Sequence, residues 1–189
     1  MEENFSINYL DQLKSLLDSF PHGRFTEIRE AMLSAYHSEK QVFIMGNGGS
    51  GSTASHFACD INKGSCFNLD KKFKVICLND NIPTMLAYAN DLSYSKVFVE
   101  QLRNFLQPGD VVIGISGSGN SDNVLQAISF ARKMKAKTIG LSGFNGGKLS
   151  QAVDIPFIVA INDMQKVEDV HMIVVHMLMQ CLCEALQSD

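Results

Sequence analysis

The chain has 189 residues, of which 46% are apolar and 19% charged, and its formal net charge is −4. This length and composition suit one folded domain, or a domain with a helical appendage, and exclude a disordered chain. The chain has no basic run, which argues against a nucleic-acid surface, and no apolar run long enough for a membrane span. Its N-terminal segment MEENFSINYL is polar, so we expect no signal peptide.

The cysteines predict an intracellular, reduced protein. Their number is odd, and their spacing fits neither a disulfide framework nor a metal motif. We therefore expect free, structural thiols and a cytoplasmic location. The five are Cys59, Cys66, Cys77, Cys181 and Cys183.

The first part of the chain predicts two helices, over about residues 5–19 and 24–38. Pro21 and Gly23 separate them. Both segments carry apolar residues at helical spacing, which predicts one packed face for each helix. These residues are Leu10, Leu13, Leu16, Leu17, Ile28, Met32 and Tyr36.

After residue 40 the pattern alternates between apolar strands and helices. Nearly continuous apolar strands separated by helices predict a parallel sheet that is covered on both faces. The sequence thus predicts a three-layer α/β/α fold with about five parallel strands, as one domain over 1–189 with a helical N-terminal extension over 1–40. The expected strands are 41–46, 73–79, 110–116, 136–142 and 154–161. The expected helices are 52–62, 83–89, 95–105, 122–134 with Ser121 as N-cap, a short one after Gly147, and 167–186.

Two junctions between a strand and a helix are rich in glycine and serine. The first runs from Gly46 to Ser52 and the second, GISGSGNS, from Gly114 to Ser121. Ligands of a parallel α/β sheet bind at such junctions, where backbone N–H groups and a helix N-terminus can hold an anion. No Walker lysine and no complete dinucleotide fingerprint follow, so a phosphate-bearing ligand other than a nucleotide is favoured. Tight turns use the same residues, which leaves a purely structural role open for either loop alone.

Acid, base and metal candidates lie on two of the predicted helices. His56 and Asp60 are four residues apart and share one helix face. The final helix carries Glu168, Asp169 and His176, of which Asp169 and His176 face the same way. Two histidines with carboxylates suit Zn²⁺ or proton transfer between adjacent sugar carbons. A surface ion pair and half-buried helix histidines are the alternative interpretation.

Three segments together resemble the sugar isomerase (SIS) domain. They are GNGGSGSTASHFACD, ISGSGNSDNV and GFNGGKLSQAVD. More narrowly, the chain is similar to phosphoheptose isomerases, which convert sedoheptulose 7-phosphate, and this similarity covers nearly all of it. The resemblance implies a flavodoxin-like five-stranded sheet, a zinc or other divalent ion, and a homotetramer with active sites at subunit interfaces.

The resemblance also implies roles for individual residues. The sugar phosphate would lie on the serine loop, at Ser116, Gly117, Ser118 and Ser121, with Gly117 at a position where the family commonly has Thr. Further substrate contacts fall at Asn47, Gly48, Gly49, Ser50, Asp91 and Glu168. The implied metal ligands are His56, Asp60, Glu168 and His176.

Three further positions depart from the family pattern and leave the exact substrate open. Asp60 stands where these isomerases usually have Glu, Glu168 where they have Gln, and Gln165 where they tend to have an acid. A shortened base can be misplaced by roughly 1 Å, which costs about 10²-fold in rate. The type of site is nevertheless retained.

The predicted reaction is a ketose–aldose isomerisation through an enediol. Asp60 acts as the base that takes the C1 proton, and His176 acts as the acid. A metal-bound Asp60 is a poorer free base, so the two roles assigned to it partly conflict. Two alternatives stay open. One is an isomerase of a different phosphosugar. The other is a non-catalytic SIS-fold module that binds a phosphosugar or a protein, as in the relative that associates with the bacterial initiator DnaA.

The homotetramer has some independent support from the amphipathic segments. The N-terminal helices and the final helix offer more apolar surface than one sheet can cover. The alternative is that these segments cap the core of a monomer. The residues of the final helix in question are Met172, Met177, Leu178, Met179 and Leu182.

Overall fold

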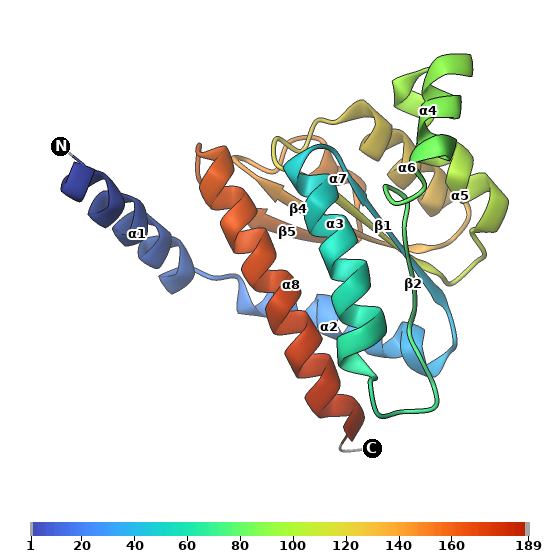
Figure 1. Ribbon diagram of the computed structural model, residues 1–189, viewed down its shortest axis with the longest axis horizontal. Coiled ribbons are helices and arrows are strands. Elements are labelled where there is room, and N and C mark those ends of the chain that lie inside the picture. Colours follow the sequence, from blue (N-terminus) through green and yellow to red (C-terminus); the bar gives the residue numbers. More distant parts are fainter. Residues whose placement is uncertain (1, 188–189) are drawn as a thin grey trace.

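A five-stranded parallel sheet forms the centre of the computed structural model, which describes residues 2–187 (Figure 1). The strand order is β2-β1-β3-β4-β5, and all neighbouring pairs are parallel. The prediction of a three-layer α/β/α fold with five parallel strands is confirmed. The strands are β1 Gln41–Gly46, β2 Lys74–Cys77, β3 Val111–Ser116, β4 Lys137–Gly143 and β5 Ile155–Val159.

Helices cover both faces of this sheet. Two of the helical elements are irregular, the π-helix η1 at Asp60–Ser65 and the 3₁₀-helix η2 at Tyr94–Lys96. The α-helices are α1 Glu2–Asp18, α2 His22–His37, α3 Gly49–Cys59, α4 Ile82–Asp91, α5 Val99–Phe105, α6 Asp122–Lys133, α7 Leu149–Ala152 and α8 Met164–Gln187.

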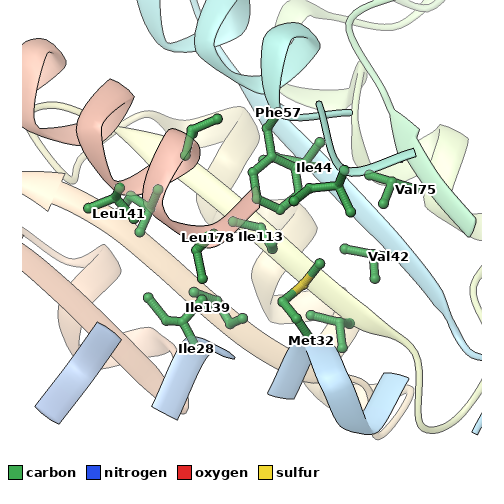
Figure 2. Packing of buried hydrophobic residues seen from close by; sticks show 14 of the residues in the cluster. Ile28, Met32, Val42, Ile44, Phe57, Val75, Ile113, Ile139, Leu141 and Leu178 are labelled. Carbon is green, nitrogen blue, oxygen red and sulfur yellow. The ribbon is translucent and has the colours of Figure 1, made fainter. Parts of the chain in front are cut away.

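The alternation of side chains along each strand divides the core into two layers. In β1, Val42 and Ile44 point to the face covered by α2, α3 and α8 (Figure 2). Phe43 and Met45 point to the opposite face, which α5, α6 and α7 cover. All four side chains are fully buried, which explains why the strand reads as a continuous apolar run.

Several element boundaries differ from the sequence-based expectation. The second strand ends at Cys77 rather than at residue 79, and the helix expected over 52–62 begins at Gly49 and becomes a π-helix at Asp60. Glycine has a low helix propensity, so the sequence hides this early start. The final helix begins at Met164, three residues early, since Asp163 Oδ1 accepts a hydrogen bond of 3.3 Å from the Lys166 amide.

Ser121 lies at the N-cap position of α6, but its hydroxyl makes no capping hydrogen bond. The expected side-chain cap is therefore wrong. The Ser121 hydroxyl instead lies 2.9 Å from the Ser116 Oγ, across the serine loop. This contact keeps both hydroxyls at the end of β3.

Helix α8 is long and apolar enough to cross a membrane by length and composition alone, with a mean hydropathy of 1.3 over its best window. It lies along the sheet beside α3 (Figure 1), and Leu178 and Leu182 belong to the core. The composition of α8 thus fits a core helix. Leu178 and Leu182, two of the apolar residues noted on this helix from the sequence, are therefore buried in the core of one chain.

The five cysteines are free thiols. Burial raises the pKa of Cys77 to about 12, so this thiol stays protonated and unreactive at neutral pH. Cys59 is exposed on α3.

Candidate active site

A cavity of about 230 Å³ opens where β1 and β3 end and α8 begins. Six of its nine lining residues carry a hydroxyl, amide or carboxylate group, which suits a polar, phosphate-bearing ligand. The lining residues are Asn47, Ser50, Ile115, Ser116, Gly117, Ser118, Ser121, Met164 and Glu168. Seven of these nine were predicted as substrate contacts from the sequence; Ile115 and Met164 were not.

The serine loop forms one wall of this cavity. Ser116 is buried and accepts a hydrogen bond of 3.4 Å from the Ser121 amide. Ser118 is exposed, and its hydroxyl accepts a hydrogen bond of 3.3 Å from the Asn120 amide. Helix α6 starts directly after Ser121, so its positive end adds to the attraction for an anion at the loop.

The first loop is braced by Asn79, which the sequence did not indicate. Asn79 lies beyond the end of β2, and its side chain bonds both backbone groups of Gly46. It accepts from the Gly46 amide at 3.1 Å and donates to the Gly46 carbonyl at 2.7 Å. The side chain thus replaces the backbone pairing that β2 no longer provides, and it fixes the point at which the loop leaves the sheet.

Asn47 is held in the cavity by two neighbours. Its amide and that of Asn123 donate to each other, both at 2.9 Å, and Tyr94 donates from its hydroxyl to Asn47 Oδ1 at 2.8 Å. Asn123 is buried, so this pair fixes the distance between the first loop and α6. The segment GNSDN contains Asn123, but its spacing gave no signal for this role.

Glu168 lies over the start of α3. A Cβ added to Gly49 would lie 2.5 Å from Glu168 Oε1, so position 49 must be glycine for the carboxylate to lie there. A carboxylate at a helix N-terminus is favoured by the helix dipole. Glu168 therefore belongs to the wall of the cavity.

A second group of functional side chains lies farther along the same two helices. His56 Nε2 is 3.0 Å from His176 Nε2 and 3.2 Å from Asp60 Oδ2. The three ligand atoms all lie within 4.8 Å of one another. His56 and His176 are exposed, whereas Asp60 is half-buried.

These three groups fit a divalent metal ion. Ligands held about 2.1 Å from a tetrahedral Zn²⁺ are roughly 3.4 Å apart, which is close to the separations in this cluster. Three protein ligands also leave a position open, as in catalytic zinc sites. Glu168, the fourth predicted ligand, is not part of the cluster.

The distance between the cavity and the cluster is set by the helices α3 and α8, which carry residues of both. Helices α3 and α8 run parallel, because Gly49 faces Glu168 near their starts and His56 faces His176 farther on. The contact between Gly49 and Glu168 and the contact between His56 and His176 are seven residues apart on α3 and eight on α8, which is about 10–12 Å along a helix. Glu168 and His176 therefore lie about 10–12 Å apart along the packed pair of helices.

Asp91, Gly48 and Gly49 are predicted site residues that neither line the cavity nor belong to the cluster. Asp91 is the last residue of α4, is exposed, and accepts a hydrogen bond of 2.9 Å from the neighbouring Asn90 side chain. Gly48 is exposed at the tip of the first loop, with a φ of 53° that favours glycine.

Comparison with known proteins identifies the family of this chain. Residues 8–143 match the family model of the SIS domain. The phosphoheptose isomerase of Trichlorobacter lovleyi is 37% identical over 163 residues, covering 86% of this chain and 80% of the relative. That of Clostridium acetobutylicum is 34% identical over 192 residues, covering 96% and 95%. The chain belongs to the SIS-domain family, among the phosphoheptose isomerases.

The fold of this SIS-domain protein also agrees with a solved relative. The structure of the phosphoheptose isomerase from Neisseria gonorrhoeae matches it with a TM-score of 0.88 and 25% identity. The match covers 96% of this chain and 97% of the other. The N-terminal helices and α8 are thus part of the shared architecture.

Proposed function

We propose that this SIS-domain protein is a ketose–aldose isomerase that converts sedoheptulose 7-phosphate to a heptose 7-phosphate through an enediol. The observation that carries the proposal is the arrangement along α3 and α8, with an anion cradle at one end and a His–Asp–His cluster at the other. The names of the relatives give the same activity for proteins that are 34–37% identical.

The separation between the cavity and the His–Asp–His cluster fits a seven-carbon substrate. Eight bonds join C1 of an extended heptulose 7-phosphate to its phosphorus atom, which is about 10 Å at the rise of an extended chain. This length is close to the 10–12 Å estimated along the helices between the level of Glu168 and that of His176. A phosphate on the serine loop thus brings C1 and C2 towards the cluster.

The cluster supplies the groups that enolisation needs. Asp60 takes the C1 proton, and His176 moves a proton between the two oxygens before the carbon proton returns to C2. His56 lies within hydrogen-bonding distance of both and orients them. The ligands His56, Asp60 and His176 would hold Zn²⁺, which would polarise the substrate oxygens.

We further propose that the protein acts as a cytoplasmic homotetramer with its sites at subunit interfaces. The exposed position of His56 and His176 supports this proposal, because a partner subunit would shield the reacting carbons from water.

A panel of ketose phosphates tests the proposed function. The purified protein, supplied with Zn²⁺, is incubated with sedoheptulose 7-phosphate, fructose 6-phosphate, ribulose 5-phosphate and unphosphorylated sedoheptulose, and aldose formation is measured. We expect the seven-carbon phosphate to have the highest kcat/KM, by at least about tenfold. The unphosphorylated sugar should have a KM that is higher by at least about tenfold, because it lacks the charged hydrogen bonds of the phosphate group. No turnover of any member would favour a non-catalytic binding module.

A further inference from the structure

The side chain of Met164, which lines the cavity, lies against the middle of the serine loop at Gly117. A Cβ added to Gly117 would overlap the Met164 Sδ and would lie 3.0 Å from its methyl carbon. Gly117 has no left-handed backbone conformation, so its glycine is not needed for a turn. The thioether of Met164 fills the space that a side chain at position 117 would need.

Neither backbone in this contact can easily move away. The Gly117 carbonyl accepts a hydrogen bond of 2.8 Å from the Gly143 amide at the end of β4. Met164 is the first residue of α8. The side chain of the preceding Asp163 accepts a hydrogen bond from the backbone amide of the buried Lys166 and forms an ion pair with its ammonium group. A larger residue at position 117 must therefore displace the Met164 side chain itself.

The contact changes the chemistry of the cavity. Apart from Ile115, the other lining side chains offer hydroxyls, an amide and the Glu168 carboxylate, whereas a thioether offers no hydrogen-bond donor. The polarizable, apolar surface of Met164 packs on the loop at Gly117, between Ser116 and Ser118. A threonine at position 117 would add a donor hydroxyl, but the thioether occupies its place.

We propose that Gly117 and Met164 form one paired specificity determinant, in which Met164 sets the room and polarity above the serine loop. This proposal depends on the proposed function in one respect only, which is that the serine loop binds a phosphate group. It makes residue 117 replaceable by a hydroxyl residue only when Met164 is made smaller.

A double-mutant cycle tests the pair, with inorganic phosphate and sedoheptulose 7-phosphate as calorimetric ligands and turnover recorded in parallel. We expect Gly117→Thr to weaken the binding of both ligands roughly tenfold or more, as overpacking requires. Met164→Ala should weaken it roughly threefold through the lost apolar wall. The double variant should bind better than Gly117→Thr, with a coupling of at least roughly fivefold. Gly117→Ala, which adds the Cβ alone, should show the same sign of coupling and guards against misfolding of the threonine variant.

Gly64 and Met179 provide the matched control. A Cβ at Gly64 would lie 2.9 Å from Met179 Sδ, so this is the same kind of contact on the same helix, outside the cavity. The pair Gly64→Ala and Met179→Ala should couple in thermal stability but not in phosphate affinity. Additive effects of the Gly117 and Met164 changes on phosphate affinity, in folded variants, would overturn the proposal. If the parent binds phosphate without isomerising any sugar, the proposed isomerase function fails. The coupling between Gly117 and Met164 in phosphate affinity then still tests the paired determinant.

Discussion

His171 shows how a single buried residue affects the stability of the fold. It is buried between α8 and β4, and its Nε2 lies 3.3 Å from the Ser142 carbonyl oxygen. Its Nδ1 and the Ser142 hydroxyl have no hydrogen-bond partner within residues 2–187. Burial lowers the pKa of His171 to about 4, because the charged imidazolium would lose its hydration.

We expect acid to destabilise the protein through His171. The unfolded chain binds this proton near pH 6.5 and the folded protein near pH 4, so stability is fully present above pH 6.5 and declines as pH falls towards 4. The loss is about 3 kcal/mol for a pKa that is lowered from 6.5 to about 4. Urea unfolding at several pH values should show it in the parent and not in His171→Leu. Replacing the exposed His22 by Gln should leave the loss in place; an equal loss in His171→Leu would contradict the assignment.

At the scale of elements, the parallel helices α3 and α8 carry both ends of the proposed site. The cluster joins them through His56 and His176, whose ring nitrogens lie 3.0 Å apart. A metal ion there would bridge two helices that pack on the same face of the sheet. Metal binding should therefore be visible in stability as well as in activity.

We expect Zn²⁺ to stabilise the metal-free protein. A ligand at about 100 times its Kd adds roughly 2.7 kcal/mol to the free energy of unfolding, and elemental analysis should find about one ion per chain. His176→Gln should remove most of this gain, whereas Glu168→Gln, which lies outside the cluster, should retain it. Thermal unfolding with and without a chelator measures the effect. Equal stabilisation of His176→Gln and the parent would contradict the metal site.

The elements also mark what sequence reasoning could reach. The strands were predictable because their apolar runs are buried on both faces, as in the fully buried β1. The serine loop and the pair His56 and Asp60 were predictable because their contacts are local. The approach of Met164 to Gly117 was not, since 47 positions in the sequence separate them and no local pattern reports a tertiary contact.

Glu168 is a second residue whose place in the site could not be predicted from the sequence. The resemblance placed it both on the substrate and on the metal, and the sequence offered no way to separate the two roles. The fold separates them because eight residues of a straight helix span about 12 Å. Glu168 therefore lies at the cavity and His176 at the cluster.

The molecule as a whole exposes apolar side chains on two protruding helices, α1 and α4 (Figure 1). Phe5 is 72% and Leu86 64% exposed, and α4 has no buried residue. Helix α1 attaches through Tyr9, which donates to Asp169 at 2.5 Å, and Lys166 lies 4.1 Å from its ring centre. The hydrogen bond to Asp169 raises the pKa of Tyr9 to about 12. Such exposed apolar helices are typical of subunit interfaces.

We expect light scattering to give about four times the chain mass of 20.8 kDa at micromolar concentration. Leu86→Glu should shift the protein to smaller species, because it places a charge in the proposed interface. Phe105→Glu, at a comparably exposed site on α5, should remain tetrameric. A parent that scatters as a monomer would contradict the assembly.

The central claim is that Asp60 and His176 transfer the protons of an enediol reaction, and NMR of sedoheptulose 7-phosphate turnover in D₂O tests it most directly. The parent should form the aldose with solvent deuterium at C2. Asp60→Asn and His176→Gln should each lower the rate by about 10²–10⁴-fold while phosphate binding persists. Asp91→Asn and Ser52→Ala provide comparison variants, the former at the predicted substrate contact outside the cluster and the latter at an exposed position on α3. An active parent whose rate is unchanged in both Asp60→Asn and His176→Gln would contradict the account.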